Sequence, residues 1–300
     1  MQIDLVLLYV DSSRKKWQEL YVETCKKYNR NKIEPHRYRE NVPLKYMLRA
    51  IEKNCPFIRT VFLIVQDRDQ VPEYVKESEH LKIIEHKDII PESLLPTYNS
   101  NTIEMYMCNI PDLSEHFIHI NDDMYPCKPM KESDFFDENG NPKLNITLKE
   151  QIPNIYRVTL KNSELLVKDV LGIKDKIVSS VYYRDGHSWN PMLKSVWQLL
   201  YQNKEEEIYR SCSTFREICN LTQQMCTYYC YLSNNFTKRD INTQYFSFNC
   251  PIFDIISGFE QNHIVCVNDG KINLNYDKDI LILLDWFANK YPEKSEKYER

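Results

Sequence analysis

The stretch Phe117-Ile118-His119-Ile120-Asn121-Asp122-Asp123 places three polar residues directly after a short, mostly apolar run. A short apolar run that ends in polar residues is typical of a strand in a parallel sheet. In open α/β sheets, ligands bind beyond the carboxyl ends of the strands, so Asn121, Asp122 and Asp123 lie where a ligand is expected. The stretch therefore predicts an α/β fold and the sheet edge at which a site would lie.

Two other apolar runs end at polar residues in the same way. Residues 6–10 run into Asp11, and residues 264–267 run into Asn268 and Asp269. Each run would put carboxylate or amide oxygens at a sheet edge.

The first 125 residues alternate strand-like and helix-like patterns, which indicates βαβ units and a largely parallel sheet. The spacing of Leu44, Met47, Leu48 and Ile51 predicts the buried face of a helix that ends near Asn54. Strands are predicted at residues 5–10, 61–65, 82–85 and 117–120. We expect this half to bind a nucleotide.

The rest of the chain predicts a mostly helical region that returns to the core. Residues 128–144 turn polar and contain Pro129, Gly140 and Pro142, which favours a surface connection. We therefore expect an α/β half at 1–127, a connection at 128–150 and a helical region at 151–300, together forming one domain. Beyond the connection, helices are predicted at 191–201, 215–231 and 277–291, and a strand at 263–268.

Composition excludes several classes of protein. The 300 residues carry a formal net charge of -4 and show no Lys/Arg stripe interleaved with aromatics, so no nucleic-acid partner is expected. No apolar run approaches the roughly 20 residues that cross a bilayer, and the chain opens without a basic leader, so we expect a cytoplasmic protein without a transmembrane segment. The ten cysteines are scattered and form no CxxC pair, which predicts reduced, mostly buried thiols rather than disulfides or zinc ligands.

The adjacent carboxylates of Asp122 and Asp123 are suited to a hard divalent cation, because they leave coordination positions for diphosphate oxygens. The alternative is that the pair caps a turn or faces solvent. His187 lies in a polar segment ahead of a predicted helix, and an imidazole is a natural base for a sugar hydroxyl at neutral pH. A structural histidine is the alternative.

Arg39 and Arg216 are candidate phosphate ligands, because a guanidinium donates two parallel hydrogen bonds and keeps its charge. Structural ion pairs are the alternative for both. Asn99 and Ser100 precede a predicted helix, where either residue would cap the helix or face an anionic ligand.

In order along the chain, these segments resemble the stealth family of sugar-phosphate transferases. The resemblance covers nearly the whole sequence and rests on four regions. The blocks are Ile3-Asp4-Leu5-Val6 through Asp11, Arg37-Tyr38-Arg39-Glu40-Asn41, residues 48–54 and 86–91, Leu95-Pro96-Thr97-Tyr98-Asn99-Ser100, Ile103-Glu104, residues 113–123, His187 with Pro191, Ser213 to Arg216, residues 265–269 and residues 291–295.

The resemblance implies a Rossmann-like or GT-A-like sheet, mostly parallel and flanked by helices, with a helical insertion or subdomain. It also implies transfer of hexose-1-phosphate, such as N-acetylhexosamine-1-phosphate, from a UDP-sugar to a saccharide hydroxyl, with release of UMP. On this reading Mg²⁺ or Mn²⁺ is the cofactor. The implied roles are metal binding by Asp122, Asp123 and Asp269, phosphoryl charge stabilisation by Arg39 and Arg216, proton removal by His187, and donor contacts by Asp11, Asn99, Ser100 and Asn121.

Two other functions stay open at this point. One is a glycosyltransferase that attacks the anomeric carbon and releases UDP, and the other is a catalytically silent saccharide-binding protein. For the transferase reading, the implied acceptor is an oligosaccharide or polysaccharide, including a lipid-linked one. Such an acceptor would place the protein at the cytoplasmic face of the inner membrane by peripheral association.

Overall fold

The central sheet has five strands in the order β3-β2-β1-β4-β9. The first four run parallel, and β9 pairs with β4 in the antiparallel direction. This confirms the predicted α/β fold with a mostly parallel sheet, although the first strand lies two residues earlier than predicted. The bounds are β1 (Ile3–Leu8), β2 (Ile58–Val65), β3 (Leu81–Glu85), β4 (His116–Asn121) and β9 (Asn190–Leu193).

The computed structural model describes residues 1–30, 38–150, 154–174, 181–185, 187–269 and 275–300, with the backbone alone at 147–150 and 181–185. Arg37, which opens one of the blocks of the family resemblance, lies outside the described residues.

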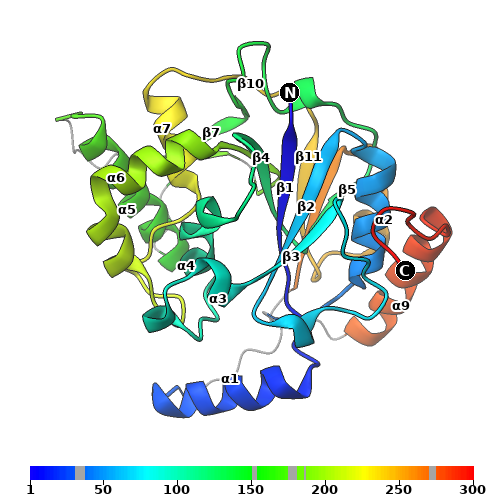
Figure 1. Cartoon of the computed structure of the whole chain (residues 1–300). Helices are drawn as coiled ribbons and strands as arrows, with labels where there is room; N and C mark the ends of the chain where they lie inside the picture. The colour runs from blue at the N-terminus through cyan, green and yellow to red at the C-terminus, as the bar shows by residue number, and fades with distance from the viewer. Residues whose placement is uncertain (31–37, 151–153, 175–180, 186, 270–274) are drawn as a thin grey trace.

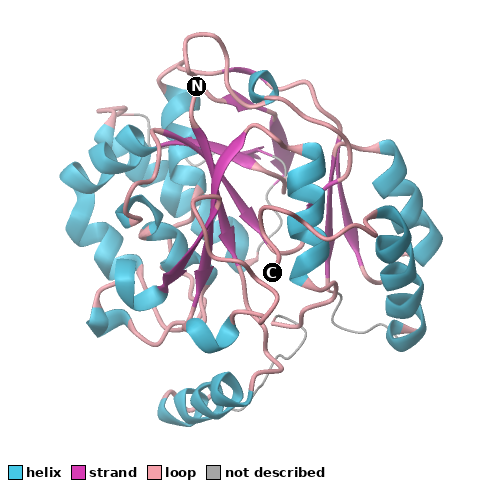
Figure 2. Cartoon of the chain, turned by 45° about the vertical axis from the view of Figure 1, so that its right-hand side comes forward, coloured by secondary structure: helices cyan, strands magenta, loops and turns pink. Residues whose placement is uncertain are grey.

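Helices cover both faces of this sheet (Figures 1 and 2). Figure 1 shows α5, α6 and α7 on one side, α2 and α9 on the other, and α1 beyond the carboxyl end of β1. The helices are α1 (Lys15–Lys27), α2 (Leu44–Asn54), α3 (His86–Ile89), α4 (Ser100–Met105), α5 (Ile155–Val170), α6 (Lys194–Ser211), α7 (Gln224–Leu232), α8 (Ile252–Gln261) and α9 (Tyr276–Lys290).

Strand β1 joins the two apolar cores of the molecule because it is buried along its whole length. Successive side chains of a strand point to opposite faces. Ile3, Leu5 and Leu7 therefore pack into the core that contains residues of α2, α8 and α9. Val6 and Leu8 pack into the core that contains residues of α5, α6 and α7.

A second sheet lies beside the first and has the order β11-β12-β5. Its strands are β11 (Thr243–Ser247), β12 (Ile264–Asn268) and β5 (Met124–Pro126), of which β12 is parallel to β11 and antiparallel to β5. The chain passes directly from β4 of the first sheet into β5 of the second, so residues 122 and 123 form the link between the sheets. Two strand pairs complete the fold, β6 (Lys143–Leu144) with β10 (Thr237–Lys238), and β7 (Ile146–Glu150) with β8 (Val181–Asp185).

Two helix predictions are wrong at their starts. The segment predicted to be helical from residue 191 first forms the edge strand β9, and the helix begins at Lys194. An edge strand accepts Pro191 because one side of that strand needs no hydrogen-bond donor. The helix predicted from residue 215 begins only at Gln224, because residues 212–220 form a loop tied to Asn99. The predicted helix at 277–291 is confirmed by α9.

All ten cysteines are outside disulfides and seven are buried, as the sequence predicts. Among the described residues, no helix is both long and apolar enough to span a membrane.

Asp4 ties β1 to its neighbours from a fully buried position. Its carboxylate accepts two hydrogen bonds from the Arg59 guanidinium, at 2.8 and 2.6 Å, and one from the Ser114 amide at 2.7 Å. The buried charge is therefore compensated on both oxygens.

Replacing Asp4→Ala should lower the free energy of unfolding by about 2–4 kcal/mol, because the Ser114 amide loses its acceptor and the half-buried Arg59 guanidinium keeps only the Asp112 carbonyl. Urea denaturation would measure the change. The matched control is Glu19→Ala, which removes an exposed carboxylate 3.8 Å from Lys15 and should change the free energy by no more than about 0.5 kcal/mol. Equal effects of the two substitutions would contradict this role of Asp4.

Candidate functional site

The β4–β5 turn, which links the two sheets, lies where the segments that contain the predicted site residues meet. The Val267 amide donates a hydrogen bond to the Asp123 carbonyl at 2.9 Å, which holds the end of β12 against the β4–β5 turn. On the other side of β4, the antiparallel strand β9 begins with Asn190 opposite His119, near the carboxyl end of β4. The segment that leads into β9, which contains His187, therefore lies at this end of the sheet. The topology thus brings residues near 122, 187 and 268 together although they are far apart in the sequence.

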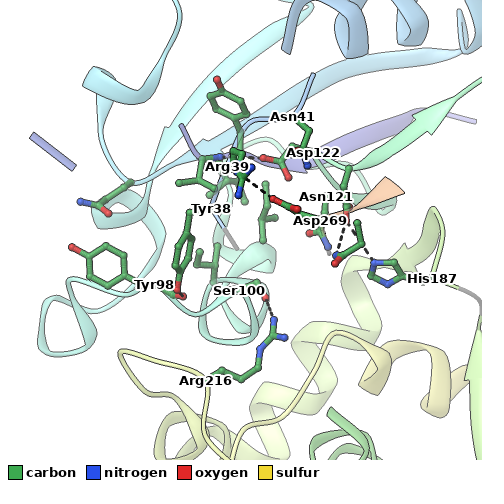
Figure 3. A pocket seen from close by; sticks show the side chains of 18 of the residues that line it. Tyr38, Arg39, Asn41, Tyr98, Ser100, Asn121, Asp122, His187, Arg216 and Asp269 are labelled. Carbon is green, nitrogen blue, oxygen red and sulfur yellow. Dashed lines mark hydrogen bonds and ion pairs between the residues drawn. The ribbon is translucent and has the colours of Figure 1, made fainter. Parts of the chain in front are cut away.

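These segments line a cavity of about 720 Å³. Eight of the ten predicted site residues line it, namely Arg39, Ser100, Asn121, Asp122, Asp123, His187, Arg216 and Asp269. Figure 3 shows His187 on the side of the cavity opposite Tyr98, with Arg216 reaching Ser100 from a third direction. Most of the predicted site is therefore one site.

The Asp122 and Asp123 carboxylates lie close enough to influence each other's ionisation. Burial and the negative charge of Asp123 raise the pKa of Asp122 to about 8, although the Val10 amide donates to it at 3.4 Å. Burial alone would raise the pKa of Asp123, but hydrogen bonding and charge from His187 lower it below the usual range. The pair therefore carries less negative charge than two free carboxylates would. A positive group bound between them would lower the pKa of Asp122 and favour ionisation of both.

His187 faces this pair of carboxylates. Its Nε2 atom lies 4.0 Å from Asp123 Oδ2, and its ring packs edge-on against Tyr245 with the ring centroids 5.6 Å apart. The same Asp123 oxygen accepts a hydrogen bond from Asn268 Nδ2 at 3.2 Å. At this separation the Asp123 carboxylate would stabilise the imidazole electrostatically when it is protonated.

Arg39 and Asp269 form an ion pair, with Arg39 Nε 3.3 Å from Asp269 Oδ2. The guanidinium also lies 4.0 Å above the centre of the Tyr276 ring. The Arg39 side chain stays 38% exposed, whereas that of Asp269 is 6% exposed, so the cation can face a ligand in the cavity while the carboxylate holds it from behind.

Arg216 reaches the cavity from the loop between α6 and α7. Its Nη2 atom donates to Ser100 Oγ at 2.8 Å. Asn99 holds this loop, because its buried side-chain amide donates to the Phe215 carbonyl at 3.3 Å and to Asn220 Oδ1 at 3.0 Å. The side-chain oxygen Oδ1 of Asn99 accepts from the backbone amide of Asn101, which makes Asn99 the N-cap of α4.

Asn99 and Asp11 are the two predicted site residues that do not line the cavity. Of the two roles predicted for Asn99, the structure shows the helix cap, together with the loop contacts described above. The Asp11 carboxylate instead accepts from the Ser13 amide at 3.0 Å and from Arg14 Nε at 2.8 Å, and it turns the chain into α1. These local partners hold the Asp11 carboxylate away from the cavity lining, so its position at a strand end did not place it in the site.

The cavity also contains groups that sequence reasoning missed. An aromatic wall of Trp17, Tyr38 and Tyr98 lines one side, held by packing of Trp17 edge-on against Tyr98 at 5.5 Å between ring centroids. Such a wall is suited to stacking on a planar base or a sugar face. Gln66 and His86 line the cavity too, and Gln66 Oε1 and His86 Nδ1 are buried without a hydrogen-bond partner among the described residues. Aromatic spacing within a single sequence gives no signal for a wall built from separate segments.

Glu104 lies behind the cavity and had no predicted role, although Ile103-Glu104 is one block of the family resemblance. It is buried on α4, where its Oε2 accepts from the Gln223 amide at 3.2 Å. Burial raises its pKa to about 7, against the lowering effect of that hydrogen bond and of the nearby Arg216 charge.

Carboxylates, an imidazole and guanidinium groups around one cavity form a site suited to an enzyme that handles an anionic substrate. Comparison with known proteins agrees with this class. The model of Stealth protein CR2, conserved region 2, matches residues 37–144. The capsular polysaccharide phosphotransferase WcwK of Streptococcus pneumoniae is 31% identical over 98% of this chain and 97% of its own length. The chain therefore belongs to the stealth family, as its motifs predicted.

Other relatives are similar over nearly the whole chain. The capsular polysaccharide phosphotransferase of Neisseria meningitidis serogroup B is 29% identical over 97% of this chain and 83% of its own length. The exopolysaccharide phosphotransferase cps2G of Lactiplantibacillus plantarum is 28% identical over 98% of this chain and 95% of its own length.

Replacing Glu104→Gln should stabilise the protein more at pH 8 than at pH 5. Since the folded-state pKa of Glu104 is raised from 4.5 to about 7, the unfolded chain releases this proton first, and wild-type stability falls as the pH rises through that interval. Glutamine removes the ionisation, so its advantage should grow by about 2 kcal/mol between the two pH values in urea denaturation. Glu19→Gln on exposed α1 is the control and should show no such difference. A Glu104→Gln effect that is the same at both pH values would contradict the raised pKa.

Proposed function

We propose that this chain transfers a hexose-1-phosphate from a UDP-sugar to a saccharide hydroxyl in polysaccharide biosynthesis, forming a phosphodiester and releasing UMP. N-acetylhexosamine-1-phosphate is the group we expect it to carry. Membership of the stealth family and relatives named as polysaccharide phosphotransferases support phosphotransfer. The single observation that carries the proposal is that His187, the Asp122 and Asp123 carboxylates and Arg216 line the same cavity.

The residues at the β4–β5 turn fit a divalent cation such as Mg²⁺ or Mn²⁺. Asp123 Oδ1 is buried and accepts no hydrogen bond from any residue that the structure describes. Burial, and after it the negative charge of Asp123, raise the pKa of Asp122, and a cation bound between the two carboxylates would offset both effects. We assign the cation to Asp122 and Asp123. Asp269 is a weaker candidate ligand, because its carboxylate is already paired with Arg39. When bound, the cation supplies positive charge that neutralises the donor diphosphate.

His187 is the group that we propose removes the acceptor proton. The acceptor oxygen then attacks the phosphorus that is bonded to the sugar oxygen, and the bond from that phosphorus to the UMP oxygen breaks. The proton stays on His187, where the Asp123 carboxylate at 4.0 Å stabilises the imidazolium. The anomeric carbon keeps its bond to oxygen throughout.

The two guanidinium groups would stabilise the charge on the phosphoryl oxygens. Arg216 is positioned by Ser100, and Arg39 is held over Tyr276 by its pairing with Asp269. Fixed charges of this kind contribute most to phosphoryl transfer, because the protein has little covalent chemistry to perform. The aromatic wall would hold the uracil base or the sugar ring. A lipid-linked acceptor and residence at the cytoplasmic face of the membrane stay predictions.

Incubation with a panel of UDP-sugars, saccharide acceptors and Mg²⁺ should release UMP with at least one donor. Mass spectrometry should then show an acceptor that has gained a hexose-1-phosphate group. Release of UDP with a gain of hexose alone would reject phosphotransfer and support a glycosyltransferase. Donor binding without release of either nucleotide across the panel would support a silent saccharide-binding protein.

Replacing His187→Ala should lower kcat by about 10²–10⁴-fold, which is the usual contribution of a positioned general base. The dissociation constant for the UDP-sugar should change little, because the acceptor and not the donor loses its partner. Initial rates and calorimetric titration measure the two quantities. His80→Ala is the matched control, since His80 lies outside the cavity with its side chain 41% exposed. Wild-type turnover of the His187 variant would remove the base assignment.

A further inference from the structure

Three different metal-ligand types meet at one edge of the cavity. Asp123 comes from the β4–β5 turn, His187 from the segment before β9, and Cys266 from the middle of β12. Each offers one ligand atom, and the carboxylate oxygen, imidazole nitrogen and thiol sulfur all lie within 4.8 Å of one another.

This set of donors differs chemically from the two carboxylates assigned to Mg²⁺. Magnesium prefers oxygen ligands, whereas a thiolate together with an imidazole favours zinc and other borderline-soft cations. Three protein ligands with a position open to a cavity are the arrangement of reactive zinc sites. We propose that Asp123, His187 and Cys266 form a site for Zn²⁺ that competes with the activating cation and reversibly blocks the enzyme. The inhibition part of this proposal rests on the proposed function, whereas the binding part does not.

The surrounding contacts fix the positions of two of the three ligands, Asp123 and Cys266. Asp123 is fixed through its backbone by Val267 and through Oδ2 by Asn268, and its buried Oδ1 has no hydrogen-bond partner among the described residues. Cys266 is fully buried within β12, so its position is set by the strand. Zinc bonds of about 2.0–2.3 Å require the three ligand atoms to close in by roughly 1 Å. His187, which is 24% exposed at the cavity, is the side chain with room to make that movement.

Occupation of this site would remove both functions proposed for its residues. Asp123 would no longer be available to the activating cation, and the His187 nitrogen that faces Asp123 would be bound to zinc and unable to accept a proton. Bound zinc is therefore expected to inhibit rather than to activate.

Binding is testable with Co²⁺ as a spectroscopic substitute for zinc, using the reduced, chelator-treated full chain without donor or acceptor. One equivalent of Co²⁺ should produce a thiolate-to-cobalt charge-transfer band in the near ultraviolet, and Zn²⁺ should abolish it. Cys266→Ser and Cys266→Ala should both lose the band, and His187→Ala should weaken cobalt binding by at least about tenfold. The matched control is Cys226→Ser, because Cys226 is a buried cysteine on α7 and should leave the band unchanged. No band in the wild type, or a band that persists in both Cys266 variants, would overturn the site.

Inhibition is then tested separately in the UMP-release assay with Mg²⁺ held constant. Zinc should inhibit the wild type and the Cys226→Ser variant equally, and the Cys266→Ser variant, compared with its own zinc-free rate, should need at least about tenfold more zinc. Equal zinc sensitivity of all three would overturn the inhibitory role even if the cobalt band is present. If no nucleotide is released at all, the proposed function fails while the cobalt result still decides the metal site.

Discussion

The site depends on one backbone hydrogen bond, from the Val267 amide to the Asp123 carbonyl, which fastens the second sheet to the turn that leaves the first. The turn has only two residues between β4 and β5, so their side chains cannot move away from this edge. The carboxylates, Asn268, Cys266 and His187 are positioned relative to that turn, whereas Arg216 is held by Ser100 and Arg39 by Asp269. Asn268 and Cys266 arrive with β12, and His187 arrives with β9, which pairs with the same strand β4.

The electrostatics of the cavity follow from the same constraint. Burial and the charge of Asp123 raise the pKa of Asp122, whereas hydrogen bonds from His187, Cys266 and Asn268 lower the pKa of Asp123 against the effect of its burial. Positive charge from an activating cation or from the His187 imidazolium would compensate these two carboxylates. The cationic groups Arg39 and Arg216 face the cavity from its other sides, and each is held by a partner rather than left in solvent.

The sequence predicted regular elements best where the apolar pattern was local. The parallel strands are confirmed because each is a short, mostly apolar run, and α9 is confirmed because its buried residues Leu283 and Phe287 lie four positions apart on one helix face. The starts of α6 and α7 were wrong because long-range contacts decide them. Pro191 pairs with Ile118 in the sheet, and the loop before α7 is tied to Asn99 across more than a hundred positions.

By itself the sequence determined the fold class, the family and the types of residue in the site, because strand-end acids and ordered motifs are local properties of the chain. Only the tertiary structure decided which of those residues share the cavity. It excluded Asp11 and Asn99 from the lining, paired Arg39 with Asp269, and added the aromatic wall, Glu104 and Cys266. The physical reason is that contact, burial and charge coupling arise between segments distant in the sequence. A cysteine that the sequence predicts as inert therefore becomes a candidate ligand once β12 lies beside Asp123 and His187.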